Sequence, residues 1–238
     1  MREIAADLAI VPGIVANAYL AGNRDSWILV DAVTSDNHPK ILRAAEARFG
    51  AGAKPRAIWL THGHFDHAGS APELAALWNV PVFAHHAELP YLTGKAQYPP
   101  HDASKPGFFS KLVRFFPART VDLSGRVREF QGGFDGWEIL ETPGHTPGHV
   151  SFFRSADGAL LAGDAVTTMD LDSMWGTLAK GRKVSRPPVP ATLNWPDARQ
   201  SVRKLAALRP KLIAAGHGHP MRDAAAELRQ LADHFAIP

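Results

Sequence analysis

The sequence contains no cysteine, and this absence restricts the chemistry that the protein can use. Without thiols there can be no disulfide and no thiolate ligand, so any bound metal must be held by His, Asp, Glu or water. No apolar run approaches the roughly 20 residues of a membrane-spanning helix. Near the N-terminus, Glu3 and Asp7 stand where a signal peptide would be apolar. We therefore expect a cytoplasmic protein with no membrane partner.

A strong excess of charge is also missing. The formal net charge of the chain is +3, and an excess this small does not predict a nucleic-acid partner. We expect a small-molecule substrate instead. A local basic cluster consists of Lys180, Arg182, Lys183 and Arg186 in a loop rich in Gly and Pro. We expect this loop to be solvated; the alternative is a patch for a substrate carboxylate or phosphate.

The length and composition predict one globular domain that spans residues 1–238. The sequence is 45% apolar and 21% charged, which is ordinary for a globular protein. A chain of 238 residues can bury one large core, and nothing in it demands a second domain. The sequence leaves the oligomeric state open.

Apolar runs and turn residues predict a chain in which strands precede helices in each half. Short runs between Gly, Asn and Asp turns predict an antiparallel meander at the start. The pattern suggests two β-sheets, although composition alone would not single out a sandwich. Strands are predicted at residues 8–11, 17–20, 27–30, 57–60, 80–84, 137–142, 150–153, 159–162 and 211–215, and helices at 39–49, 72–78, 196–208 and 222–235, with a long loop at 170–193.

Residues 85–118 are predicted to form an irregular, Pro-rich excursion that ends in a helix. In that helix, Phe108–Phe116, the apolar residues form a broad stripe. The stripe is typical of a helix packed against a core. The alternative is a lid that lines an apolar substrate pocket.

Three imidazoles and one carboxylate occur together in His62-Gly-His64-Phe-Asp66-His67, directly after the predicted strand 57–60. Imidazole nitrogens and carboxylate oxygens suit Zn²⁺ and similar divalent ions. We expect a loop in which His62 and His64 face one position while Asp66 and His67 turn towards a second. One tetrahedral ion would not normally take four ligands from a single loop, so the motif indicates two metals.

Three further candidate ligands stand where predicted strands end. They are His145 in Pro-Gly-His-Thr-Pro-Gly-His149, Asp164 after Gly163, and His217 in Gly-His-Gly-His219. Ligands at strand ends sit on a rigid scaffold. Neighbouring glycines would let the backbone approach a metal without a Cβ clash.

Taken together, these residues resemble the metallo-β-lactamase superfamily, and in particular its glyoxalase II-like dinuclear branch. The resemblance extends from Asp31 to the final Gly-His-Gly. It implies an α+β fold, an αββα sandwich of two mixed β-sheets face to face with helices outside. It also implies metal ligands: His62, His64 and His145 for the first ion, Asp66, His67 and His217 for the second, and Asp164 as the bridge between them.

The remaining histidines match no ligand position of the family. We expect His149 and His219 to support the ligands or the fold without binding a metal. His85 and His86 are candidates for support from the neighbouring strand. His38, His101 and His234 are expected to be ordinary surface residues.

The resemblance implies a hydrolase in which a hydroxide between two divalent ions attacks an acyl carbon. We expect Zn²⁺, with iron or manganese as alternatives, and catalytic roles for Asp66 and Asp164. The substrate would be a small molecule with an ester, thioester or lactone bond. The related lactonases have a Tyr shortly after the bridging Asp, but this sequence has Thr167 there, so Tyr91 or Tyr98 would have to substitute.

Other activities are known on the same scaffold. A persulfide dioxygenase-like enzyme would hold one iron through two His and the Asp, but the full seven-ligand set favours two metals. A β-lactamase is disfavoured because its cysteine-using subclasses are excluded. Phosphodiesterase activity on the same scaffold stays an alternative. RNA nuclease activity is disfavoured, because such enzymes commonly add an RNA-binding arm or a further domain, which this length and charge do not supply. A purely structural metal is disfavoured because such sites are usually closed tetrahedra.

Overall fold

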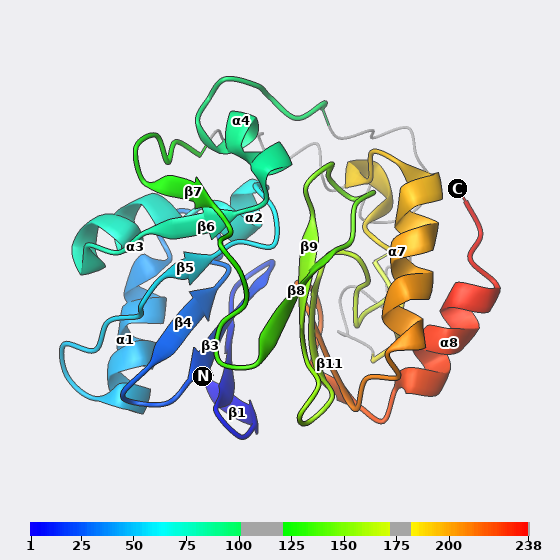
Figure 1. Ribbon diagram of the computed structural model, residues 1–238, viewed down its shortest axis with the longest axis horizontal. Helices are drawn as coiled ribbons and strands as arrows, with labels where there is room; N and C mark the ends of the chain where they lie inside the picture. The colour runs from blue at the N-terminus through cyan, green and yellow to red at the C-terminus, as the bar shows by residue number, and fades with distance from the viewer. Residues whose placement is uncertain (101–120, 172–181, 238) are drawn as a thin grey trace. The chain divides into compact units, whose positions relative to one another are not determined.

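The computed structural model describes residues 1–100, 121–171 and 182–237 (Figure 1). The chain divides into two compact units, and each is built on one β-sheet. The first unit takes Met1–Tyr98 and Arg119–Gln131, and the second takes the rest of the chain. The predicted helix at Phe108–Phe116 lies outside the described residues, as do His101 and Lys180. The predicted lid therefore remains a prediction.

The sheet of the first unit has the strand order β1-β2-β3-β4-β5-β6-β7 among the described residues. Neighbouring strands are antiparallel from β1 to β4 and parallel from β4 to β7. The strands are β1 (Arg2–Ala5), β2 (Leu8–Pro12), β3 (Asn17–Gly22), β4 (Trp27–Val30), β5 (Ile58–Trp59), β6 (Val82–Ala84) and β7 (Val127–Glu129). The parallel half matters for the site, because the carboxyl ends of parallel strands lie at the same edge of a sheet.

Helices α1 (His38–Phe49) and α3 (Ala71–Trp78) share an apolar core with one face of this sheet. On α1, Ile41, Ala45 and Phe49 follow one another at four-residue spacing, and all three are buried. Phe49 stacks on Trp27 of β4, with ring centroids 4.6 Å apart. Aromatic pairs of this kind add to the stability that burial provides, so the contact helps to fix α1 on the sheet.

Three shorter helical segments complete the first unit. They are α2 (Phe65–Ala68), the 3₁₀ turn η1 (His86–Glu88) and α4 (Leu89–Leu92). Each begins within a few residues of the carboxyl end of β5 or β6. They therefore lie at the sheet edge where the parallel strands end.

The sheet of the second unit has the order β12-β11-β10-β9-β8 among the described residues. Only β10 and β11 run parallel; the other neighbours are antiparallel. The elements are β8 (Trp137–Glu141), β9 (Val150–Arg154), β10 (Ala159–Gly163), η2 (Val189–Ala191), α7 (Trp195–Ala207), β11 (Leu212–Ala215), β12 (Met221–Arg222) and α8 (Ala225–Asp233). Helices α7 and α8 form a second apolar core with this sheet. No helix of the described ranges is long and apolar enough to cross a membrane.

The predicted fold class is confirmed: two mixed sheets carry the helices, and the chain starts with the expected antiparallel meander. Three strands were missed. β1 begins with exposed charged residues, β7 lies at a sheet edge, and β12 has only two residues. Such strands lack the apolar alternation that marks a half-buried strand. The start of the last helix was predicted too early, because Arg222 belongs to β12 and the helix α8 begins at Ala225.

Helix α3 offers a direct test of the first core. Leu74 is fully buried, whereas Leu77, on the same helix, is 61% exposed. We expect Leu74→Ala to destabilise the protein by about 2–5 kcal/mol, because it leaves a cavity in the core. Leu77→Ala should change the stability by less than about 0.5 kcal/mol. Urea unfolding of both variants checks this, and equal losses would show that the assignment of the core face is wrong.

Candidate metal centre

The first unit brings together the four candidate ligands of the 62–67 motif. All four side chains are buried. The expected loop is wrong in one respect, because residues Phe65–Ala68 form the one-turn helix α2. The turn closes when the backbone N–H groups of His67 and Ala68 donate to the carbonyl of His64. As a result His62 has ligand atoms within 4.8 Å of those of His64 and of His67, and Asp66 is equally close to His67.

Asp31 orients the ring of His67. Its Oδ2 lies 2.8 Å from Nδ1 of His67, and both groups are buried. An ionised carboxylate can only accept, so Nδ1 carries the proton and Nε2 carries the ring's lone pair. That lone pair is the one a metal requires, and Nε2 lies 3.9 Å from Oδ2 of Asp66.

Thr61 orients the ring of His62 in the same way. The Thr61 hydroxyl lies 2.9 Å from Oδ2 of Asp31 and 3.0 Å from Nδ1 of His62. Its single proton goes to the carboxylate, so it accepts the proton on Nδ1 of His62. The lone pair of His62 is therefore on Nε2. Asp31, directly after β4, supports two histidines at the sheet edge where β5 also ends.

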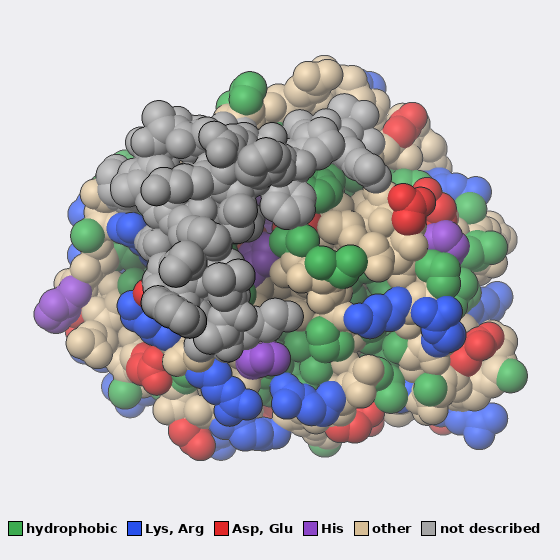
Figure 2. Space-filling view, turned by 180° about the vertical axis from the view of Figure 1, so that it is seen from behind, with side chains coloured by type: hydrophobic (Ala, Val, Ile, Leu, Met, Phe, Trp, Pro, Cys, Tyr) green, Lys and Arg blue, Asp and Glu red, His purple; other side chains and the backbone are tan. Residues whose placement is uncertain are grey.

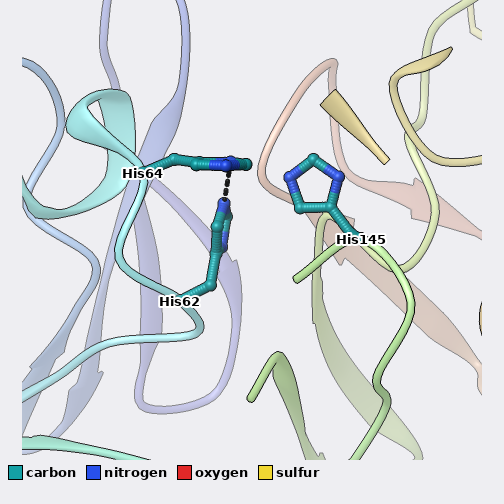
Figure 3. Close-up of side chains that lie close together, drawn as sticks. All are labelled: His62, His64 and His145. Atoms are coloured by element: carbon teal, nitrogen blue, oxygen red, sulfur yellow. Dashed lines mark hydrogen bonds between the residues drawn. The ribbon is translucent and has the colours of Figure 1, made fainter. Parts of the chain in front are cut away.

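His62 and His64 face each other through nitrogens that could share one ion. Nε2 of His62 lies 3.0 Å from Nδ1 of His64 (Figure 3). The two rings meet almost at right angles, with centroids 4.7 Å apart. The two side chains are thus paired through the ring atoms that can bind a metal.

The second unit brings together His145, Asp164 and His217. Oδ2 of Asp164 lies 3.1 Å from Nε2 of His217 and 3.5 Å from Nε2 of His145. The three residues follow β8, β10 and β11, whose carboxyl ends share one edge of the sheet. One carboxylate oxygen therefore faces two ring nitrogens, and all three side chains are buried.

His145 is held in the required tautomer by Thr192. The Thr192 hydroxyl donates to the carbonyl of Pro188, at 2.7 Å. It must then accept the proton on Nδ1 of His145, from which it is 3.3 Å away. Nε2 of His145 is left as the nitrogen with the lone pair. Thr192 thus acts on His145 as Thr61 acts on His62.

His149 supports Asp164 through the backbone. Its Nε2 accepts the backbone N–H of Asp164, at 2.8 Å, so the proton is on Nδ1. That proton goes to the hydroxyl of Thr142, at 2.9 Å. Thr142 in turn donates to Ser151, and Ser151 donates to the carbonyl of Ala162. The interpretation of His149 as a supporting residue agrees with these contacts.

Gly144, beside His145, lies against helix α7. Gly144 has a φ of +130°, and a Cβ placed there would lie 2.3 Å from the backbone nitrogen of Ala198. Ala198 belongs to α7. The glycine allows the loop to pack closely against this helix, which fixes the position of His145.

Two of the three residues considered as sources of a phenol or hydroxyl, Thr167 and Tyr98, donate their hydroxyl protons to groups of the protein. The buried Thr167 hydroxyl donates to the carbonyl of Met169, at 2.8 Å. The Tyr98 hydroxyl donates to Glu88. Tyr91 stacks on Tyr98, with ring centroids 4.1 Å apart. Neither Thr167 nor Tyr98 therefore offers its proton to a substrate in this arrangement.

The remaining histidines lie in varied surroundings. His85 accepts the backbone N–H of Ala87 and so caps η1, and His86 is exposed beside Glu129. His234 is exposed as predicted, but His38 is half-buried and its Nδ1 is shielded from solvent. His219 is half-buried, and its supporting role stays a prediction.

The described part of the predicted basic cluster agrees with a solvated loop. Arg182 and Lys183 are exposed, and Arg186 is half-buried. Lys183 forms an ion pair with Asp170, with 3.0 Å between nitrogen and oxygen. The contacts give no sign of a preformed anion site.

The donor set fits divalent metals. It consists of imidazole nitrogens and carboxylates, which suit zinc, iron and manganese. Hydrogen bonds at Nδ1 direct the lone pair of His62, His67 and His145 to Nε2. This is the usual support of metal-binding histidines in proteins. The sequence patterns missed the supporting residues Thr61 and Thr192, and used Asp31 only as the start of the family resemblance. The available signal was a polar residue at the end of a buried apolar run: Asp31 directly follows β4, and Thr61 follows Leu60, just after β5.

A comparison with protein families decides the membership of the chain. Residues 11–217 match the model described as the metallo-beta-lactamase superfamily. The chain belongs to this superfamily. A curated relative, "Probable metallo-hydrolase YflN" of Bacillus subtilis, is 39% identical over 233 residues, which cover 93% of this chain and 88% of the relative. A hydroxyacylglutathione hydrolase of Rhodopseudomonas palustris is 30% identical over 192 residues, covering 75% of this chain and 62% of that protein.

Solved structures of the metallo-β-lactamase superfamily share the fold. The structure titled "Crystal structure of TTHA1623 in a di-iron-bound form" is 25% identical, with a TM-score of 0.64 over 95% of this chain and 98% of that chain. The BLEG-1 B3 metallo-beta-lactamase has a TM-score of 0.63 over 95% of this chain and 97% of that chain. Its identity of 22% shows a common fold only. The metallo-β-lactamase fold expected from the motifs is thereby confirmed.

Asp31 gives a test of how the ligands are oriented. We expect Asp31→Asn to weaken zinc binding about 10–100-fold, the usual effect of losing a partner that orients a ligand. Asp31 now accepts hydrogen bonds from the backbone and hydroxyl of Thr61 and from His67. The NH₂ group of an Asn side chain would face one of these donors and could not accept its hydrogen bond. Competition with a chromophoric chelator measures the affinity. Asp25→Asn, at an exposed site of the same unit, is the control. Unchanged zinc affinity in Asp31→Asn would show that this carboxylate does not orient the ligands.

Proposed function

We propose that this metallo-hydrolase uses two divalent metal ions to cleave an ester, thioester or lactone bond in a small molecule. The observation that carries the proposal is the position of Asp164, whose Oδ2 faces the Nε2 atoms of both His145 and His217. A carboxylate between two ligating nitrogens is suited to a shared position between two ions. Structural sites with one ion are usually closed tetrahedra and do not need such a bridge.

The proposed ligands are those of the sequence analysis. His62, His64 and His145 would hold the first ion, and Asp66, His67 and His217 the second, with Asp164 shared. Support comes from the side chains that lie close together within each unit. In the first unit His62 has ligand atoms within 4.8 Å of those of His64 and His67, and Asp66 is equally close to His67. In the second unit Asp164 faces His145 and His217. Superfamily membership supports the same assignment.

Two bound divalent ions would supply an acidified water as the nucleophile and would polarise the acyl carbonyl. The chain's own residues would do the rest. The carboxylate of Asp164 would be the ligand that the two ions share. Asp66, at the start of α2, would orient the nucleophile by accepting its proton in a hydrogen bond. Asp31 and Thr61 would keep the imidazole lone pairs directed at the ions.

Zinc is the proposed metal, and iron is the main alternative. Both accept imidazole and carboxylate ligands, and TTHA1623, which shares the fold, is described in a di-iron-bound form. No thiolate is present to favour zinc over iron. Metal analysis of the purified protein distinguishes the two.

A thioester is the favoured substrate class within the proposal. Relatives named hydroxyacylglutathione hydrolase support it. The chain spans half the length of one of these relatives, so their substrate is carried over only as a proposal. A lactone has less support, because the hydroxyl of Thr167 is bonded to the backbone and that of Tyr98 to Glu88.

A nucleic-acid substrate has little support from the charges. On the described part of the face drawn in Figure 2, Lys and Arg side chains lie among acidic and hydrophobic ones. A nucleic-acid-binding surface would gather positive charge in one patch or stripe. We therefore favour a small molecule over RNA or DNA.

Asp164→Ala tests the proposal. We expect it to lose one of two metal equivalents and to lower kcat/KM by at least about 100-fold, because removal of a shared ligand costs more than loss of a supporting contact. The assay is metal analysis together with thioester, lactone, phosphodiester and β-lactam substrates. Asp233→Ala, exposed on α8 of the same unit, is the control.

Full metal content and full turnover in Asp164→Ala would show that the bridging assignment is wrong. Purified protein with a single iron, consuming oxygen in the presence of a persulfide, would favour the dioxygenase alternative instead.

A further inference from the structure

A buried carboxylate outside the ligand set holds the backbone between two proposed ligands. Glu88, in η1, is 0% exposed. Its Oε2 accepts the backbone N–H of Gly63, at 2.9 Å, and the hydroxyl of Tyr98 donates to the same oxygen. The Tyr98 oxygen in turn accepts from the N–H of Gly63, at 3.1 Å. Three groups thus form a closed set of hydrogen bonds around one peptide unit.

That peptide unit joins His62 to Gly63, the residue that precedes His64. The ring of Tyr98 also contacts the ring of His64, with centroids 4.6 Å apart and an angle of 64° between the planes. Tyr98 therefore acts on this segment in two ways, through the backbone of Gly63 and through the side chain of His64. Tyr91 stacks on Tyr98 nearly in parallel, with ring centroids 4.1 Å apart.

Only glycine fits between the two histidines. A Cβ at Gly63 would lie 2.6 Å from the Tyr98 oxygen and 3.1 Å from a methyl carbon of Leu92. The first distance is too short for any real contact, so Tyr98 would have to move. The side chains of Leu92 and Tyr98 thus pack directly against the backbone between His62 and His64.

The Tyr98 hydroxyl is both a donor and an acceptor in this set of hydrogen bonds. It donates to Glu88 and accepts from the backbone N–H of Gly63. Burial raises the pKa of this hydroxyl, and the neighbouring Glu88 carboxylate raises it further.

We propose that Tyr98 and Glu88 are positioning residues for the first metal ion. By fixing the peptide between His62 and His64 they keep Nε2 of one and Nδ1 of the other 3.0 Å apart and ready to share that ion. The proposal rests on the proposed function, because it needs a metal at these two histidines. It assigns no contact with substrate to either residue.

The test is a cobalt(II) titration of the full chain, followed by the visible ligand-field spectrum, which reports the geometry of each bound ion. We expect Tyr98→Phe to lower the affinity for one of the two cobalt ions about 10–100-fold and to change the spectrum of that ion. The affinity and spectrum of the other ion should stay as in wild type. Tyr91→Phe removes a hydroxyl from the neighbouring stacked ring and is the matched control. It should bind both equivalents normally.

Glu88 provides the second pair of variants, which keeps the test informative if Tyr98→Phe fails to fold. Glu88→Gln retains an oxygen for the N–H of Gly63 and should keep most of the affinity for the first ion. Glu88→Ala removes it and should lose that affinity. If Glu88→Gln keeps the affinity that Glu88→Ala loses, Glu88 acts by accepting the hydrogen bond of Gly63. Equal affinity in both variants would show that this hydrogen bond is not required.

The outcomes distinguish this inference from the proposed function. Wild-type protein that binds two cobalt ions while Tyr98→Phe and Glu88→Ala bind them equally well would overturn the positioning role alone. Wild-type protein that binds no cobalt would overturn both proposals. Selective loss of one equivalent in Tyr98→Phe, with normal binding in Tyr91→Phe, supports the positioning role.

Discussion

The hydrogen bond at Nδ1 of His62, His67 and His145 is the constraint on which the site depends. A neutral imidazole has one donor and one acceptor nitrogen, so a partner at Nδ1 decides which nitrogen can bind a metal. Asp31, Thr61 and Thr192 supply that partner for His67, His62 and His145.

The two sheets supply the rigidity that this arrangement needs. Parallel β4 and β5 end at one edge and deliver Asp31 and His62 there. In the second unit, parallel β10 and β11 deliver Asp164 and His217 to a common edge. Side chains on strand ends hold their positions better than side chains on long loops. The short helix α2 then turns Asp66 and His67 back towards the same edge of the first sheet.

The sequence predicted the parts of this protein that rest on local patterns. The 62–67 motif and the ligands after apolar runs were visible because polar residues directly follow buried strands. The hydrogen bonds that support the ligands could not be predicted from local patterns, because they join residues far apart in the sequence. His67 and Asp31 are 36 residues apart, and His145 and Thr192 are 47 residues apart. A Thr or Glu is common, and only the fold shows which ones reach a ligand. Strands β1 and β7 were missed because their exposed residues hide the apolar period.

A crystal structure of the zinc-loaded protein, with anomalous data at the zinc edge, tests the central claim most directly. The account predicts two zinc peaks, with His62, His67 and His145 coordinating through Nε2 and Asp164 touching both ions. A single peak, peaks away from these side chains, or coordination of His67 through Nδ1 in place of its bond to Asp31 would contradict it.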